Sequence, residues 1–381
     1  MAPVLYGIAV VPVLIWLYLL IGRGWFWRVA SERASVRRPS AARRVVVLIP
    51  ARNEAAVIGT AIASLARQAF NGLIHLIVID DGSTDGTAEA ARAAAGAAGV
   101  LPRFELLMSS AVPSGWTGKL WALSQGVAAA AHRGADYLLF SDADTCHGPA
   151  SVASLVAEAE ACNRDLVSHM VKLSAATCAE RLLVPAFVFF FFKLYPPAWI
   201  ADPKRKLAAA AGGCLLIRPQ ALARAGGLER IRSHIIDDCA LARRVKDSGG
   251  RISLELAPET RSLRSYRSST EIGAMISRTA FAQLRHSYLL LAATLLGLFV
   301  TYLLPVVLLL SGDPPLLILG LAALLLMSLC YLPMVRFYGL SPLWSMCLPL
   351  IAMFYGGAVV HSAVQYARGT GGRWKGRVQD R

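Results

Sequence analysis

Apolar residues are concentrated in long runs at the two ends of the chain. Residues 2–22 contain no charge, and a helix of this length, at ~1.5 Å per residue, crosses a hydrocarbon core of about 30 Å. Further apolar runs fill much of residues 287–366. The pattern predicts an N-terminal transmembrane anchor (1–22) and a C-terminal membrane region (287–366) of two to three transmembrane helices.

The charges beside these runs predict their orientation. A basic juxtamembrane linker (23–44) follows the first run, whereas a cleaved secretory signal carries its positive charge in front. By the positive-inside rule the linker and the segment 45–285 face the cytoplasm. If the last apolar run spans, the basic tail (367–381) lies outside, against that rule, so a re-entrant or interfacial last segment stays open.

Another apolar run, residues 182–200, contains five phenylalanines but is broken by Lys193, Pro196 and Pro197. A crossing here would place Asp142 and Asp238 on opposite sides of the membrane. We therefore predict a helix lying in the membrane interface, with a buried helix of the soluble domain as the alternative.

Between the membrane segments, apolar strands alternate with polar turns and helices. Strands are expected at 45–49, 73–79 and 136–140, and helices follow the first two. This alternation predicts an α/β fold, a Rossmann-like, mostly parallel sheet with helices on both faces. Ligands bind such sheets at the carboxyl ends of the strands.

Acidic clusters follow three of the apolar segments. Asp80 and Asp81 end one strand, Asp142 and Asp144 end another, and Asp237-Asp238 begins a predicted helix. Unpaired buried carboxylates are costly, so such clusters stay solvated or meet a cation. The spacing of Asp142 and Asp144 suits one divalent ion shared with a ligand's phosphates, as Mg²⁺ is typically held.

Four motifs in this order carry a family resemblance: Val46-Val-Leu-Ile-Pro-Ala-Arg-Asn-Glu54, Val78-Ile-Asp-Asp-Gly-Ser-Thr-Asp85, Ser141-Asp-Ala-Asp144 and Asp237-Asp-Cys-Ala-Leu241. Together they resemble the family 2 inverting glycosyltransferases of the GT-A fold. The stretch Gly115-Trp-Thr-Gly-Lys-Leu-Trp-Ala-Leu123 is similar to the hopene-associated, ceramide-glucosyltransferase-like membrane subgroup. The resemblance implies a GT-A glycosyltransferase domain over residues 45–285.

The resemblance also implies residue roles. Asp238 would be the catalytic base beside Asp237, and Asp144 would bind the metal, with Asp142 near the metal or the ribose. Asp81 would contact the uracil ring. The remaining residues expected near the nucleotide sugar are Pro50, Arg52, Asn53, Glu54, Asp80, Lys119 and Arg278. Arg278 stands where related enzymes carry Q-x-x-R-W, but the Gln and the Trp are absent here, which weakens a polymerase reading.

Composition narrows the class of protein further. The chain of 381 residues is 56% hydrophobic and carries a formal charge of +15, most of it outside residues 45–285. This distribution favours an anionic membrane surface over a nucleic-acid partner. The seven cysteines show no C-x-x-C spacing, so neither a disulfide framework nor a zinc site is indicated. We expect a multi-pass protein of a bacterial-type cytoplasmic membrane.

The predicted function is transfer of one sugar from a nucleotide-diphosphate sugar, expected to be a UDP-sugar, to the hydroxyl of a membrane lipid. The cofactor would be Mg²⁺ or Mn²⁺, and the subgroup resemblance names a hopanoid or related lipid as a candidate acceptor. One alternative is transfer to a polyprenyl phosphate, which needs no base. Another is a non-catalytic membrane protein that senses sugar nucleotides, although the predicted spans contain almost no ionisable residues.

Overall fold

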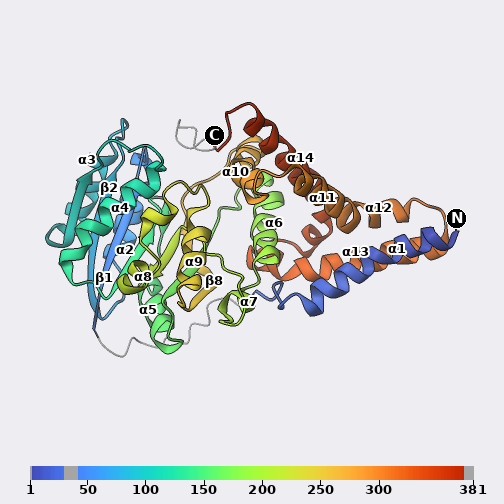
Figure 1. The fold of residues 1–381 in the computed structure, drawn as a ribbon, viewed down its shortest axis with the longest axis horizontal. Helices are drawn as coiled ribbons and strands as arrows, with labels where there is room; N and C mark the ends of the chain where they lie inside the picture. The colour runs from blue at the N-terminus through green and yellow to red at the C-terminus, as the bar shows by residue number, and fades with distance from the viewer. Residues whose placement is uncertain (1, 30–41, 373–381) are drawn as a thin grey trace. The chain divides into compact units, whose positions relative to one another are not determined.

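A computed structural model of the chain describes residues 2–29 and 42–372. In this structure the chain folds into two compact units (Figure 1). The sheet unit comprises residues 30–174 and 199–265, and the helical unit comprises residues 1–29, 175–198 and 266–381. The predicted continuous domain 45–285 therefore differs from the observed division, because residues 175–198 and 266–285 belong to the helical unit.

The sheet unit is built on a mixed sheet of eight strands in the order β3-β2-β1-β4-β7-β6-β8-β5. The strands β3, β2, β1 and β4 are parallel, as predicted, whereas β7 runs antiparallel to both β4 and β6. The pair β6–β8 is parallel and β5–β8 is antiparallel. The strands are β1 (Arg43–Ala51), β2 (Gly72–Asp80), β3 (Phe104–Met108), β4 (Tyr137–Ser141), β5 (Thr145–Cys146), β6 (Leu166–Lys172), β7 (Cys214–Ile217) and β8 (Ile252–Ser262).

Helices cover both faces of this sheet. They are α2 (Ala55–Ala66), α3 (Thr87–Ala97), α4 (Gly118–Ala130), α5 (Ser151–Ala161), α8 (Pro219–Arg224) and α9 (Asp237–Asp247), with short 3₁₀ turns η2 (Leu101–Arg103), η3 (Ala131–Arg133) and η4 (Leu228–Ile231). The prediction of helices on both faces is thus confirmed.

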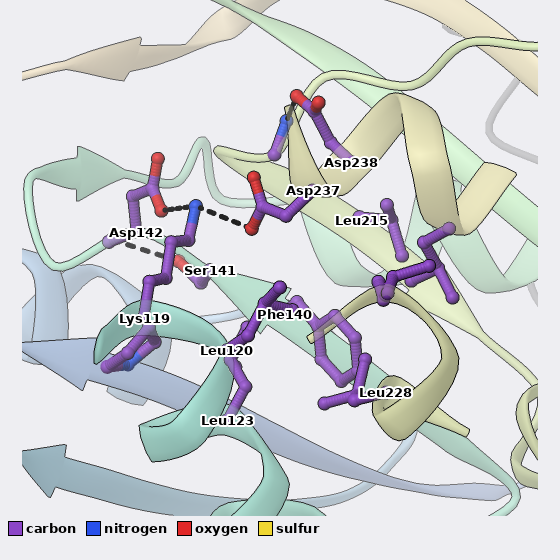
Figure 2. A pocket seen from close by; sticks show the side chains of 14 residues that line it. Lys119, Leu120, Leu123, Phe140, Ser141, Asp142, Leu215, Leu228, Asp237 and Asp238 are labelled. Atoms are coloured by element: carbon purple, nitrogen blue, oxygen red, sulfur yellow. Dashed lines mark hydrogen bonds and ion pairs between the residues drawn. The ribbon is translucent and has the colours of Figure 1, made fainter. Parts of the chain in front are cut away.

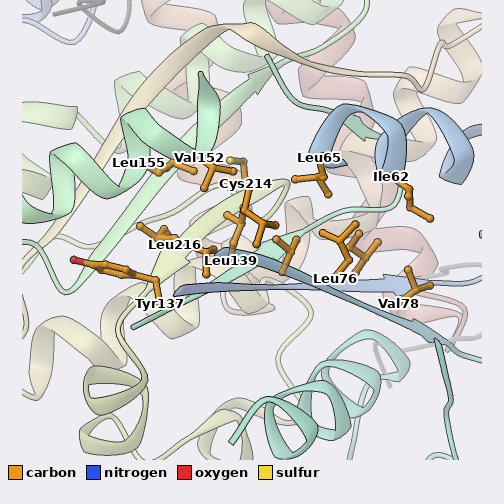
Figure 3. Packing of buried hydrophobic residues seen from close by; sticks show 14 of the residues in the cluster. Ile62, Leu65, Leu76, Val78, Tyr137, Leu139, Val152, Leu155, Cys214 and Leu216 are labelled. Carbon is orange, nitrogen blue, oxygen red and sulfur yellow. The ribbon is translucent and has the colours of Figure 1, made fainter. Parts of the chain in front are cut away.

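The alternation along β1 explains the two layers. Val45, Val47 and Ile49 join a buried cluster with side chains of α2, α3 and α5 (Figure 3). Successive strand residues point to opposite faces, so Val46 and Leu48 face the other side, where α4 packs. There Gly126 allows close approach, since a Cβ would lie 3.3 Å from Leu48 Cδ2.

Among residues 2–29 and 42–372, five helices are long and apolar enough to cross a membrane, and they lie wholly or mainly in the helical unit. These candidate spans are Val4–Gly22, Cys178–Ala201, Tyr288–Leu309, Pro314–Phe337 and Pro342–Ala367. Its elements are α1 (Ala2–Leu17), η1 (Tyr18–Gly22), α6 (Cys178–Leu194), α7 (Pro197–Ala201, ending in the sheet unit), α10 (Ser269–Gln283), α11 (Tyr288–Leu298), η5 (Phe299–Leu303), α12 (Leu304–Leu309), α13 (Pro314–Phe337), η6 (Pro342–Cys347) and α14 (Leu348–Ala367).

The phenylalanine-rich run forms α6 and packs among the other helices of this unit. Its Phe189 ring lies 5.0 Å from that of Tyr331 on α13, and Phe190 lies 4.9 Å from Tyr355 on α14. The hydroxyl of Tyr355 donates to the Leu183 carbonyl at 2.9 Å. These contacts explain why α6 groups with the apolar helices. The alternative interpretation, a buried helix of the soluble domain, would have grouped it with the sheet. Its predicted position in the membrane interface stays a prediction.

The predicted basic segments are described only in part. Strand β1 begins at Arg43, so the last two residues of the predicted linker 23–44 belong to the sheet. Residues 30–41 of that linker and 373–381 of the basic tail lie outside the described residues.

Candidate active site

Two loops at the carboxyl ends of β1 and β2 are joined by polar contacts. Asn53, in a left-handed conformation (φ 53°), accepts a hydrogen bond from the Thr84 amide at 2.9 Å and donates its own amide to Ser83 Oγ at 3.0 Å. The Glu54 amide donates to Thr87 Oγ1 at 2.8 Å. The predicted nucleotide loops therefore form one connected edge of the sheet.

The carboxylates of Asp80 and Asp81 make different contacts at this edge of the sheet. Asp80 is buried, and its Oδ1 accepts from the Ser83 amide at 3.0 Å, which shapes the turn. Asp81 is also buried, and its carboxylate lies 3.7 Å from Arg52 Nη1, which in turn donates to the Asp81 carbonyl. A nucleotide contact by Asp81 stays a prediction, and the described structure gives this carboxylate a cationic neighbour.

Lys119 lies between two of the predicted acidic motifs (Figure 2). It is the second residue of α4, and its Nζ lies 2.9 Å from Asp142 Oδ1 and 3.6 Å from Asp237 Oδ2. Burial works against the ammonium, but the carboxylates outweigh it and hold the pKa of Lys119 above its ordinary value. Asp142 follows β4 and Asp237 begins α9, so three segments distant in sequence meet at this one cation.

Asp238, the predicted base, is held by backbone amides. Its Oδ2 accepts from Gly212 N at 2.8 Å, and its Oδ1 accepts from Cys239 N at 2.7 Å. Burial and the neighbouring Asp237 raise the pKa of Asp238 to about 6, although Lys119 opposes the rise. Gly212 allows this close approach, because a Cβ there would lie 3.2 Å from Lys119 Nζ and 3.3 Å from Asp238 Oδ2 and would press on both side chains.

These groups share one small pocket. Pro50, Lys119, Asp142, Asp237 and Asp238 contribute to its lining, and apolar side chains such as Phe140 and Leu228 form its other walls (Figure 2). The structure thus brings together residues from three of the four motifs and from the stretch 115–123. Asp81 and Asp144 are not among the residues that line this pocket.

Asp144 is instead paired with a residue that the sequence analysis missed. Arg264, which follows β8, places its Nε 3.2 Å from Asp144 Oδ2 and its Nη2 2.9 Å from Glu54 Oε1. Burial and the nearby Asp142 raise the pKa of Asp144, and Arg264 counteracts this. No motif marks Arg264, which is one of three arginines at residues 261, 264 and 267, so only the fold reveals its position.

The histidine beside the second acidic motif is buried and structural. His147 Nε2 lies 2.8 Å from Ser141 Oγ, and its Nδ1 lies 3.3 Å from Ser151 Oγ. Burial lowers the pKa of His147 to about 4, so the ring is neutral near pH 7. This buried chain of hydroxyls and imidazole supports the loop that carries Asp142 and Asp144.

Arg278 lies on α10, in the helical unit. Its Nε is buried and has no hydrogen-bond partner among the described residues. The predicted diphosphate contact of Arg278 stays a prediction.

The donor set at the second acidic motif fits a magnesium- or manganese-type ion. Asp142 and Asp144 offer carboxylate oxygens, the ligands that these hard cations prefer. The described residues contain no group of three or more His, Cys, Asp or Glu side chains placed to hold a metal. An ion bound at these two carboxylates would therefore complete its shell with water and with oxygens of a bound ligand, such as phosphates.

Taken together, the geometry defines an α/β protein with an acidic pocket at the carboxyl ends of its parallel strands. The sequence model of the family described as "Glycosyl transferase family 2" matches residues 46–223. Over these residues the chain is therefore similar to glycosyltransferase family 2, and the predicted GT-A-like fold is confirmed. A comparison with curated protein sequences found no match.

One of the similar solved structures, that of PcManGT, supports the same fold. The mannosyltransferase PcManGT from Pyrobaculum calidifontis, in complex with GDP-Man and Mn²⁺, is 18% identical with a TM-score of 0.57, over 94% of this chain and 98% of that chain. TarS from S. aureus is 18% identical (TM-score 0.42), over 62% of this chain and 40% of that chain. Glucosyl-3-phosphoglycerate synthase from Mycobacterium tuberculosis, with Mg²⁺ and UDP, is 22% identical (TM-score 0.39), over 61% of this chain and 75% of that chain.

Proposed function

We propose that this protein is a membrane-bound, inverting, metal-dependent glycosyltransferase that moves one sugar from a nucleotide-diphosphate sugar to a lipid hydroxyl. The observation that carries the proposal is the meeting of Asp142, Asp237 and Asp238 with Lys119 in one pocket. Glycosyl transfer from a nucleotide diphosphate needs positive charge on the leaving diphosphate and a base on the acceptor hydroxyl.

In the proposed reaction, Asp238 removes the proton of the acceptor hydroxyl. A general base works best when its pKa lies near the working pH, and the raised pKa of Asp238, about 6, favours that role. The hydroxyl oxygen then attacks the anomeric carbon while the bond to the diphosphate breaks. A single displacement with one base inverts the anomeric centre.

Asp144 and Asp142 would hold the divalent ion, whose contribution is to stabilise the charge of the leaving diphosphate. The donor class rests on the similarity to glycosyltransferase family 2 and on PcManGT, whose fold matches and whose structure holds GDP-Man and Mn²⁺. We propose a UDP-sugar from the motif resemblance, with a GDP-sugar as the competing donor that this neighbour suggests.

The lipid acceptor is proposed from the five apolar helices that can cross a membrane. A hopanoid or related lipid is the candidate that the subgroup resemblance favours, with the sheet unit on the cytoplasmic side of the membrane. Transfer to a polyprenyl phosphate is the second candidate, because its acceptor is already an anion and requires no base.

The test uses the full-length protein in lipid nanodiscs supplied with lipid extract, Mn²⁺ or Mg²⁺, and radiolabelled UDP- and GDP-sugars. We expect labelled lipid from one donor, and a loss of turnover of about 10²–10⁴-fold in Asp238→Asn with donor binding kept. Asp247→Asn is the matched control, because Asp247 lies exposed at the end of the same helix. Near-normal turnover in Asp238→Asn supports the polyprenyl phosphate, and donor binding without labelled lipid from any donor supports a sensor.

A further inference from the structure

Arg264 bridges two carboxylates that come from different strand ends. Its Nη2 lies 2.9 Å from Glu54 Oε1, just before α2, and its Nε lies 3.2 Å from Asp144 Oδ2, just after β4. Two nitrogens of one guanidinium thus neutralise a residue of the predicted nucleotide loop and the predicted metal ligand. A planar guanidinium with fixed donors is well suited to such a double contact.

The backbone around Arg264 is fixed to the same loop. Leu263 N donates to the Asp144 carbonyl at 2.7 Å, and Arg264 N donates to Ser262 Oγ at 3.2 Å. The first of these bonds holds the backbone next to Arg264 beside Asp144 without using the arginine side chain. The side chain itself is 38% exposed, compared with 16% for Asp144 and 14% for Glu54. The Arg264 side chain is therefore open to solvent on one side, whereas the two carboxylates are largely buried.

A divalent ion and Arg264 compete for the same oxygens. An ion bound to the carboxylate of Asp144 would lie close to the positive guanidinium of Arg264, and the repulsion between them would oppose binding. A nucleotide diphosphate removes that conflict, because phosphate oxygens offer Arg264 a second anionic partner with matching geometry. The ion would then gain both Asp144 and the phosphates.

We propose that Arg264 is a displaceable counter-cation that makes divalent-ion binding depend on the nucleotide diphosphate. This inference rests on the proposed function. Without nucleotide, Arg264 forms ion pairs with Asp144 and Glu54 and keeps the affinity of the site for the metal low. When the nucleotide diphosphate binds, Arg264 moves to its phosphates, and metal and nucleotide strengthen each other's binding by the same factor, as linkage requires.

The test measures Mn²⁺ binding to the full-length protein in detergent by electron paramagnetic resonance, alone and with UDP or GDP. In Arg264→Gln we expect tighter binding of Mn²⁺ alone, and a smaller enhancement of that binding by the nucleotide. The change should lie within about 5- to 150-fold, the usual range for coupled sites. Arg264→Lys keeps the positive charge but lacks the planar guanidinium, so its Mn²⁺ affinity should lie between those of the wild type and Arg264→Gln.

Arg261→Gln is the matched control. Arg261 is exposed and lies three residues before Arg264, and its substitution removes the same charge. It should bind Mn²⁺ like the wild type, and Asp144→Asn should lose the nucleotide-dependent binding. If Arg264→Gln matches the wild type while Asp144→Asn loses binding, the inference on Arg264 is overturned and the proposed function stands. If Arg261→Gln changes Mn²⁺ affinity as much as Arg264→Gln does, general charge explains the effect and the inference also fails. If the wild type binds Mn²⁺ no better with either nucleotide, both proposals fail.

Discussion

The pKa of Asp238 gives the proposed mechanism a measurable signature. Burial and Asp237 raise this pKa to about 6. If Asp238 must be ionised to act as the base, the ionised fraction in the free enzyme is about 9% at pH 5 and about 91% at pH 7. The value of kcat/KM should therefore rise about tenfold between these pH values. An aspartate of ordinary pKa, about 3.9, would give almost no change over the same range.

The assay is sugar transfer to lipid at subsaturating donor across pH 4.5–8, with donor binding measured in parallel. Each phosphate of a nucleotide-diphosphate sugar carries one ester and one anhydride bond and keeps a single, strongly acidic hydroxyl, so the diphosphate of the donor does not titrate in this range. In Asp237→Asn the acidic limb should move to lower pH, because a like charge beside Asp238 has been removed. A flat profile between pH 5 and 7, or an unmoved limb in Asp237→Asn, would refute the assignment of Asp238 as the base.

Two further substitutions test how the site is supported. Gly212→Ala places a Cβ 3.2 Å from Lys119 Nζ and 3.3 Å from Asp238 Oδ2, so turnover should fall by about 10²-fold, and a wild-type rate would contradict the proposed close approach. His147→Ala leaves the buried hydroxyls of Ser141 and Ser151 without their imidazole partner; chemical denaturation should show a loss of about 2–4 kcal/mol, whereas His132→Ala, at an exposed position, should show almost none.

Local sequence patterns predicted the first half of the sheet well. The predicted strand 73–79 corresponds to β2 (Gly72–Asp80), and the predicted strand 136–140 corresponds to β4 (Tyr137–Ser141). The reason is that buried parallel strands appear as short apolar runs that end in polar turns. The same rule placed Asp80, Asp142 and Asp144 at strand ends, since their position depends on local order alone.

Features that depend on contacts between distant residues could not be predicted from the sequence. Strand β7 has only four residues, and nothing in Cys-Leu-Leu-Ile reveals that it runs antiparallel to both neighbours. The pairing of Arg264 with Glu54 and Asp144 joins residues 210 and 120 positions apart. The apolar run of α6 looked compatible with an interfacial or a soluble position, and only its aromatic contacts group it with the other apolar helices.

The charge balance of the site leads to the last prediction, on metal removal. Two cations, Lys119 and Arg264, lie among five carboxylates around the pocket and the second acidic motif. These carboxylates belong to Glu54, Asp142, Asp144, Asp237 and Asp238. A donor diphosphate adds two negative charges, and charges ~4 Å apart interact by about 4 kcal/mol near a protein surface. We therefore expect chelation with EDTA to weaken UDP or GDP binding by about 100-fold, equivalent to about 2.7 kcal/mol, and Mn²⁺ to restore it. The nucleotide affinity of Asp144→Asn should hardly respond to EDTA. Equal nucleotide affinity of the wild type with and without EDTA would show that Lys119, Arg264 and other protein cations suffice, and would remove the metal from the proposed mechanism.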